Sequence, residues 1–228
     1  MAELRIRRWG EGDRVAVLVH GMTTDSGSWW RLGPILAERG YRVLAPDLPG
    51  HGRSRRGDYT LQGMAEALAQ AVPNAPVLAV GHSLGALVLA GVVDRIAPDR
   101  AVYVDPPWGA PPGLEVADFL RAQQDWTIEQ LAAFHPRWPW AAVREKHAAL
   151  ARWDPETLVV ARDYPGPRAV PPLRPSLVVA AESRSMIDAA LAGKLRTEGY
   201  EVRVASGTGH VVHNDDIDSF LTAVDGWL

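Results

Sequence analysis

The stretch VLAVGHSLGALVLAG, residues 77–91, decides the fold. A short apolar run at residues 77–80 leads into the pattern G-x-S-x-G at residues 81–85, and a helical pattern follows over residues 84–96. A serine between two glycines, at a strand-to-helix junction, is typical of the sharp turn that exposes a nucleophile at the edge of a sheet. We therefore predict that Ser83 is a nucleophile. The alternative is an ordinary turn in which Ser83 only caps the helix.

Short apolar runs recur along the whole chain, and they are continuous rather than alternating with polar residues. Such runs are typical of strands that are buried on both faces of a parallel sheet. Helical patterns separate them, so we predict an α/β fold with a mostly parallel central sheet and helices on both faces. The strand runs are residues 15–19, 42–45, 77–80, 101–104, 177–181 and 202–204, and the helical patterns are residues 29–36, 61–72, 84–96 and 217–228.

The segment from Pro106 to Pro175 breaks this alternation, because it holds helical patterns and prolines but no convincing core strand. We predict a core domain formed by residues 1–105 and 176–228, with residues 106–175 inserted as a helical cap. The segment carries five of the nine tryptophans, which either line a pocket or form the cap's own core. Trp108 follows a strand end closely, so we expect it to contact substrate. The helical patterns of the segment are residues 116–124, 128–134, 140–152 and 155–161.

Composition and charge limit the size of the core, the classes of partner and the location that can be expected. The 228 residues, 47% of them hydrophobic, are enough for one sizeable core. A net charge of -3 with scattered basic residues gives no footprint for nucleic acid or an anionic membrane. The chain has no cysteine, no apolar leader at its start and no apolar run of membrane-spanning length. We expect a cytoplasmic protein without nucleic-acid or membrane partners, and its oligomeric state, a homodimer included, stays open.

Two loops after predicted strands carry further candidates. His20-Gly21-Met22 follows the first confident strand, and such a loop can aim backbone N–H groups at a developing oxyanion. We expect the amides of Met22 and Leu84 to form an oxyanion hole, Gly21 to border the substrate, and His20 to fix the loop.

The second loop, residues 206–210, places His210 between the last predicted strand and the last helix. Histidine titrates close enough to neutral pH to take and return a serine proton, so His210 is the predicted general base. His213, nearer the helix, is the alternative, and a structural contact is expected for it. None of the seven histidines shows metal-ligand spacing, and we predict neither a metal site nor a cofactor.

Taken together, three segments resemble the α/β-hydrolase fold of the esterase, lipase and haloperoxidase-like group: residues 17–54, residues 77–91 and residues 207–228, in the family's order and spacing. The resemblance implies a doubly covered sheet and a Ser-His-acid triad. It says little about substrate, because this fold hosts many reactions and some proteins without catalysis. Because the nucleophile position holds Ser83, similarity in mechanism to the relatives that attack with an aspartate is disfavoured.

The resemblance also exposes a missing carboxylate. Most relatives carry the triad acid a few residues after the strand predicted at residues 177–181, and that position is Arg184. A guanidinium cannot orient an imidazole or stabilise an imidazolium. Either the acid has moved or the triad is broken.

Four carboxylates follow predicted strands closely enough to be considered. Asp105 ends the run at residues 101–104, an acid position that resembles zearalenone-lactonase-like hydrolases and certain dehalogenases, and we choose it as the triad acid. Glu182 is the alternative, although its side chain is expected to point away from the histidine. Asp47 is expected to be structural, and Asp188 to lie in the next helix.

The resulting hypothesis is a cofactor-independent serine hydrolase that cleaves a small to medium, largely apolar carboxylic ester or lactone through an acyl-enzyme. Two alternatives remain open at this stage. One is a binding or receptor-like protein that has kept the fold and lost turnover, which Arg184 would suit. The other is a lyase or a C–C bond hydrolase that uses the same triad.

Overall fold

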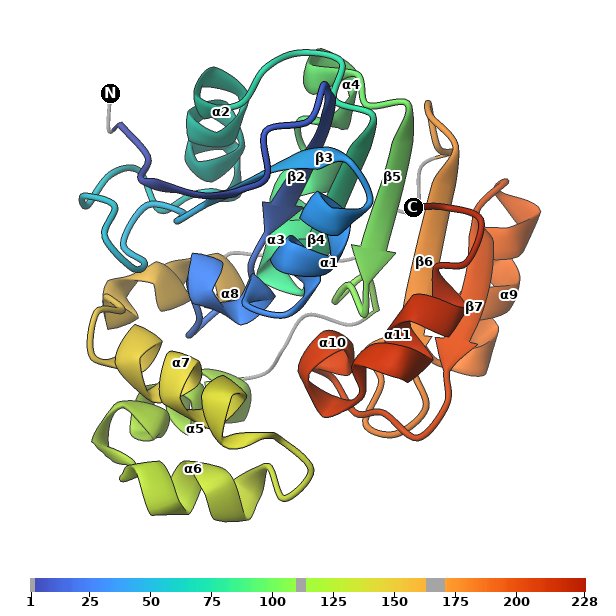
Figure 1. The fold of residues 1–228 in the computed structure, drawn as a ribbon. Coiled ribbons are helices and arrows are strands. Elements are labelled where there is room, and N and C mark those ends of the chain that lie inside the picture. The colour runs from blue at the N-terminus through green and yellow to red at the C-terminus, as the bar shows by residue number, and fades with distance from the viewer. Residues whose placement is uncertain (1–2, 110–113, 163–170) are drawn as a thin grey trace.

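The computed structural model describes residues 3–109, 114–162 and 171–228. These residues form a seven-stranded sheet in the order β1-β3-β2-β4-β5-β6-β7, in which β1 pairs antiparallel with β3 and every other pairing is parallel (Figure 1). The strands are β1 (Ile6–Trp9), β2 (Arg14–Val19), β3 (Tyr41–Pro46), β4 (Leu78–His82), β5 (Arg100–Val104), β6 (Ser176–Ala181) and β7 (Glu201–Ala205). All six predicted strands are present, so the predicted fold class is confirmed.

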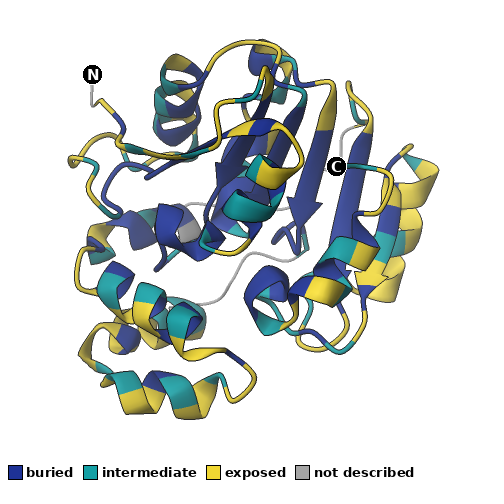
Figure 2. Ribbon diagram, in the orientation of Figure 1, coloured by how far each residue is buried: buried dark blue, intermediate teal, exposed yellow. Residues whose placement is uncertain are grey.

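Helices cover both faces of the sheet, and the inner strands β2 to β6 are largely buried (Figures 1 and 2). Alternate residues of β2 show the two layers: Val17 packs with Leu68 and Val88 on one face, and Leu18 packs with Leu36 on the other. Residues of α2, α3, α4 and α9 form the first layer, and residues of η1, α1, α10 and α11 form the second. The bounds are η1 (Ser26–Trp29), α1 (Leu32–Glu38), α2 (Leu61–Ala71), α3 (Leu84–Ala90), α4 (Val93–Ile96), α9 (Ala189–Thr197), α10 (Val212–Asp215) and α11 (Ile217–Ala223).

Between β5 and β6 the chain forms a group of helices beyond the arrowheads of the parallel strands (Figure 1). They share a small apolar cluster of their own, which includes Leu131, Trp138 and Trp153. The elements are α5 (Leu114–Ala122), η2 (Gln123–Asp125), α6 (Ile128–Phe134), α7 (Trp140–Leu150), η3 (Pro155–Leu158) and α8 (Val159–Arg162). Every helical pattern predicted in this interval corresponds to helical structure. The predicted cap boundaries at residues 106 and 175 enclose residues 110–113 and 163–170, which lie outside the described part.

Two local predictions differ from the structure. The helix predicted over residues 84–96 is two helices, α3 and α4, because Gly91 and the β-branched Val92 that follow α3 favour helix poorly. Strand β1 was not predicted, since its sequence IRRW has no continuous apolar run and its middle residues are exposed at the sheet edge. Among the described residues, no helix combines the length and apolar character needed to cross a membrane.

Candidate active site

Ser83 lies on a strained turn between β4 and α3. Its backbone adopts φ 51° and ψ −114°, and its N–H donates to the Val104 carbonyl of β5 at 3.0 Å. The flanking glycines make the turn possible. A Cβ on Gly81 would lie 2.5 Å from the Gly85 carbonyl oxygen, and a Cβ on Gly85 would lie 2.2 Å from the Val19 carbonyl oxygen. The G-x-S-x-G pattern therefore reflects backbone contacts that leave no room for side chains, and the turn exposes the hydroxyl of Ser83.

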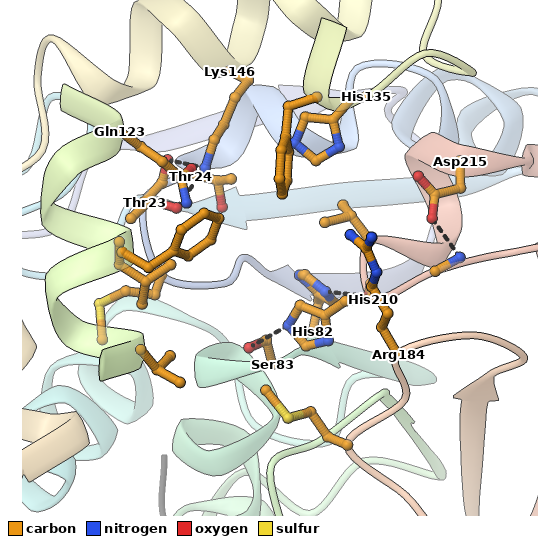
Figure 3. Close-up of a pocket in the computed structure, with 18 of the residues that line it drawn as sticks. Thr23, Thr24, His82, Ser83, Gln123, His135, Lys146, Arg184, His210 and Asp215 are labelled. Carbon is orange, nitrogen blue, oxygen red and sulfur yellow. Dashed lines mark hydrogen bonds between the residues drawn. The ribbon is translucent and has the colours of Figure 1, made fainter. Parts of the chain in front are cut away.

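His210 joins Ser83 to Asp105. Its Nε2 lies 3.0 Å from Ser83 Oγ, and its Nδ1 lies 2.6 Å from Asp105 Oδ2 (Figure 3 shows the first contact). His82, buried beneath it, fixes the histidine backbone, because its Nε2–H donates to the His210 carbonyl at 2.9 Å. Burial holds the pKa of His82 well below its usual range, so this ring is neutral. The three side chains are thus arranged in the order that proton transfer from a serine requires.

Asp105 is fully buried, with several donors around its carboxylate. Oδ1 accepts hydrogen bonds from the Ala181 N–H at 3.2 Å, the Ser185 hydroxyl at 2.5 Å and the Met186 N–H at 3.2 Å. Oδ2 accepts from the Met186 N–H at 3.2 Å as well as from His210. A buried carboxylate needs such partners to remain charged. The loop after β6, where relatives are expected to carry the acid, therefore supplies donors for an acid on the neighbouring strand β5.

The other carboxylates that the sequence offered are occupied elsewhere. Glu182 accepts the Gly207 N–H at 2.9 Å, and Asp188 caps α9 by accepting the Leu191 N–H at 2.7 Å. Asp47 accepts N–H groups of its own neighbourhood, including that of Ser26 at 2.8 Å. Arg184, with φ 51°, sits on the turn after β6 and lines the cavity beside His210 (Figure 3).

The loop after β2 lies against the serine turn. A Cβ on Gly21 would lie 3.3 Å from Ser83 Cβ, so Gly21 permits close approach. His20 is buried and fixes the loop as expected: its Nε2 accepts the Leu48 N–H at 3.0 Å and its Nδ1 lies 2.8 Å from the Gly21 carbonyl oxygen. Leu84 opens α3, so its N–H has no intrahelical acceptor. Met22 lines the cavity above Ser83.

His213 has the structural role predicted for it. Its Nε2 lies 2.8 Å from Ser28 Oγ, and its ring stacks on Trp29 at a centroid distance of 4.2 Å. Burial lowers its pKa to about 3, which keeps it neutral.

A cavity of about 1000 Å³ opens over Ser83, between the sheet edge and the helices that follow β5. Its wall is largely apolar and includes Leu87, Phe119, Leu120 and Val160. Polar groups also reach it, among them Thr23, Thr24, Gln123, His135, Lys146, Arg184 and Asp215 (Figure 3). Ser183 and Arg137 line it as well.

Trp108 does not line this cavity. It is 2% exposed and packs against Tyr103 and Tyr200, at centroid distances of 4.8 Å and 5.4 Å, in the core layer beside β5. It borders instead a second cavity on that face of the sheet. The expectation that Trp108 contacts substrate is therefore not supported, because its ring packs into the core, although its neighbour Pro107 lines the cavity. Trp138, from the small apolar cluster, is the tryptophan at the cavity wall.

Three polar residues near the site were not singled out from the sequence. Ser185 donates to Asp105, and Lys146 and Gln123 face the cavity from the helical segment. Lys146 is one of only two lysines in a chain with 24 basic residues, and this rarity is a signal that could have drawn attention to it. Within residues 3–109, 114–162 and 171–228, no three His, Asp or Glu side chains group as metal ligands would.

The parallel sheet with its serine turn, histidine loop and buried acid defines an α/β protein with a linked Ser83-His210-Asp105 cluster at the carboxyl edge of the strands. Residues 16–223 match the model of the Alpha/beta hydrolase family, and the chain belongs to this family.

Curated relatives with partial alignments agree with that assignment. The chain is 37% identical over 127 residues to the pimeloyl-[acyl-carrier protein] methyl ester esterase of Methylococcus capsulatus. This alignment covers 52% of this chain and 48% of the relative. It is 42% identical over 96 residues to the enzyme of the same name from Sodalis glossinidius. That alignment covers 42% of this chain and 37% of the relative. The chain thus matches about half or less of the length of these relatives.

Solved structures share the fold over nearly the whole chain. The N-formylmaleamic acid deformylase of Pseudomonas putida S16 superposes with a TM-score of 0.82 at 22% identity, and covers 98% of this chain and 96% of its own. E-2-(acetamidomethylene)succinate hydrolase superposes with a TM-score of 0.78 at 21% identity. The superposition covers 98% of this chain and 94% of the hydrolase. At this level of identity the similarity shows the fold alone.

Proposed function

We propose that the protein is a serine hydrolase that cleaves a carboxylic ester or lactone through a covalent acyl-enzyme. The observation that carries the proposal is the continuous chain from Ser83 Oγ through His210 to the buried Asp105, with contacts of 3.0 Å and 2.6 Å. Curated relatives named as methyl ester esterases support ester cleavage over other reactions of this fold.

The first half of the reaction follows from the arrangement of the three side chains. Ser83 Oγ attacks the substrate carbonyl carbon while its proton passes to His210 Nε2. Asp105 accepts the Nδ1–H of the ring, holds the tautomer whose Nε2 is free, and stabilises the imidazolium that forms. The N–H groups of Met22 and Leu84 are proposed to receive the oxyanion. His210 then returns the proton to the departing alkoxide, and the acyl group stays on Ser83.

The second half releases the acid. A water molecule gives a proton to His210 Nε2 and attacks the acyl carbon, and the proton returns to Ser83 Oγ as the acid leaves. The carboxylate missing at position 184 does not weaken this mechanism, because Asp105 occupies the far side of His210. A binding protein that had lost turnover would have no need of a buried carboxylate with three protein donors besides the histidine contact.

The test combines labelling with turnover. A fluorophosphonate probe should label the wild-type protein at Ser83, and Ser83→Ala should not be labelled. A screen of p-nitrophenyl esters of graded chain length, beside a panel of macrolactones, should find a hydrolysed substrate. Ser83→Ala should then lower kcat by several orders of magnitude with the fold intact. Retention of more than about a tenth of the activity would show that Ser83 is not the nucleophile.

A further inference from the structure

Lys146 is a buried cation that meets no carboxylate partner among the described residues. Its side chain comes from α7, is 8% exposed, and faces the cavity above Ser83 (Figure 3). The ammonium donates to the carbonyl and hydroxyl oxygens of Thr23 at 3.1 Å and 2.5 Å, and within the described ranges it forms no ion pair. An ammonium has three donors, so one N–H remains for a ligand. A charge buried in this way is costly unless an anion compensates it.

Gln123 adds a second unused polar group to the same side of the cavity. It is 4% exposed, it comes from η2, and its side-chain amide forms no hydrogen bond to any described residue. In Figure 3 both Gln123 and Lys146 point into the cavity from the side away from Ser83. A buried amide with donors to spare is the expected complement of a carboxylate oxygen.

The charge balance of the cavity favours an anionic ligand. Among the described residues, three cationic side chains, Lys146, Arg137 and Arg184, line it against one carboxylate, Asp215. That carboxylate is already used, because its two oxygens accept the Trp138 Nε1–H and the Gly209 N–H, each at 2.6 Å. The apolar wall between the two ends suits a hydrocarbon chain.

We propose that the acyl chain of the substrate ends in a carboxylate, which Lys146 and Gln123 bind while the ester carbonyl lies at Ser83. The substrate class is then the half-ester of a dicarboxylic acid, a refinement that rests on the proposed ester hydrolysis. A Cβ on Gly21 would lie 3.3 Å from Ser83 Cβ, and Thr23, which holds the ammonium, is two residues after Gly21. Two residues span at most about 7.6 Å along the Cα trace, so the distance suits an acyl chain of modest length.

The kinetic test compares two series of substrates. Monomethyl esters of succinic, glutaric, adipic and pimelic acids are set against methyl alkanoates with the same number of acyl carbons, and acid release is followed by chromatography. At the best length and at pH 6, we expect kcat/KM for the half-ester to exceed that for the neutral ester about tenfold or more, because a charged hydrogen-bonded contact is lost with the neutral chain. Lys146→Met should abolish this ratio.

Lys194→Met is the matched control, because Lys194 is the other lysine of the chain, lies on α9 and is exposed. It should keep the wild-type ratio. Gln123→Glu provides a second variant if Lys146→Met does not fold: a carboxylate facing the ammonium should replace the substrate's own and reduce the ratio to about one. A ratio that survives in both Lys146→Met and Gln123→Glu, or that is lost in Arg184→Met alone, would overturn the assignment.

A binding measurement separates this proposal from the proposed reaction. Calorimetry of adipate and its homologues with Ser83→Ala needs no turnover, and binding should weaken about tenfold or more when Lys146→Met is added. If no ester is hydrolysed and Ser83 is not labelled, the proposed function fails, while this binding result still decides the carboxylate site. If neither adipate nor its homologues bind, the carboxylate site is wrong even where neutral esters are hydrolysed.

Discussion

Replacement of Asp105 by Asn tests the most unusual feature of the site. The Oδ1 side of the carboxylate faces three donors, from Ala181, Ser185 and Met186, so the amide oxygen of an asparagine must take that place. The amide NH₂ then faces His210 Nδ1, where Oδ2 accepted a hydrogen bond at 2.6 Å in the wild type. Because two donors cannot bond each other, His210 must offer Nδ1 as an acceptor and carry its proton on Nε2.

That tautomer points an N–H at Ser83 and cannot take the serine proton. The imidazolium also loses its compensating charge. We expect Asp105→Asn to lower kcat by roughly 10³ to 10⁴ with KM little changed. The amide oxygen keeps the donors of the β6 loop, so the thermal midpoint should stay close to that of the wild type.

The assay is kcat and KM on the best ester of the screen, with circular dichroism to verify the fold. Glu182→Gln is the matched control: Glu182 accepts only the Gly207 N–H among described groups, and a glutamine oxygen can do the same. Its activity should be close to wild type. If Asp105→Asn stayed near wild type while Glu182→Gln collapsed, the acid would not be on β5 and the assignment would be wrong.

Two further predictions concern stability. Trp108→Ala should lower the free energy of unfolding, measured with denaturant, by about 3–5 kcal/mol and leave KM nearly unchanged, because the ring packs in the core against Tyr103 and Tyr200. A large change in KM with little loss of stability would instead assign Trp108 to the substrate site. Burial lowers the pKa of Lys146 to about 7, so between pH 7 and its unfolded value of 10.5 the unfolded chain binds more protons and stability rises with pH. The stability of Lys146→Met relative to wild type in urea should therefore fall by about 3 kcal/mol from pH 6 to pH 9, and a constant difference would contradict a buried, charged Lys146 at low pH.

The inner parallel strands could be predicted from the sequence because burial on both faces demands continuous apolar runs, and each of these runs became a strand. The run at residues 202–204 also became a strand, although β7 lies at the sheet edge and Val204 is exposed. The edge strand Ile6–Trp9 could not, since one antiparallel pairing to β3 needs no such run. Trp108 was misjudged for a related reason. Closeness to a strand end in sequence does not specify which face of the sheet the following ring turns to, and this ring joined the layer beside Tyr200.

The position of Asp105 shows how far residue types alone can lead. Arg184 excludes a carboxylate at one strand end, and parallel strands bring their carboxyl ends to one edge, so an acid on the adjacent β5 can approach the same histidine. Whether such an acid can accept a hydrogen bond from the histidine depends on which groups replace its lost contacts with water. The sequence does not show those groups. Asp105 lies in the interior at no exposed area, and it can remain an acceptor there because the β6 loop turns its Ala181 and Met186 amides and the Ser185 hydroxyl toward it. Arg184 lies on this same turn at φ 51°, so the segment with no carboxylate at position 184 provides the donors for Asp105. No sequence motif marks the end of the cavity that Gln123 and Lys146 form. These two residues come from separate helices, and only the packing of the segment between β5 and β6 brings them to the cavity.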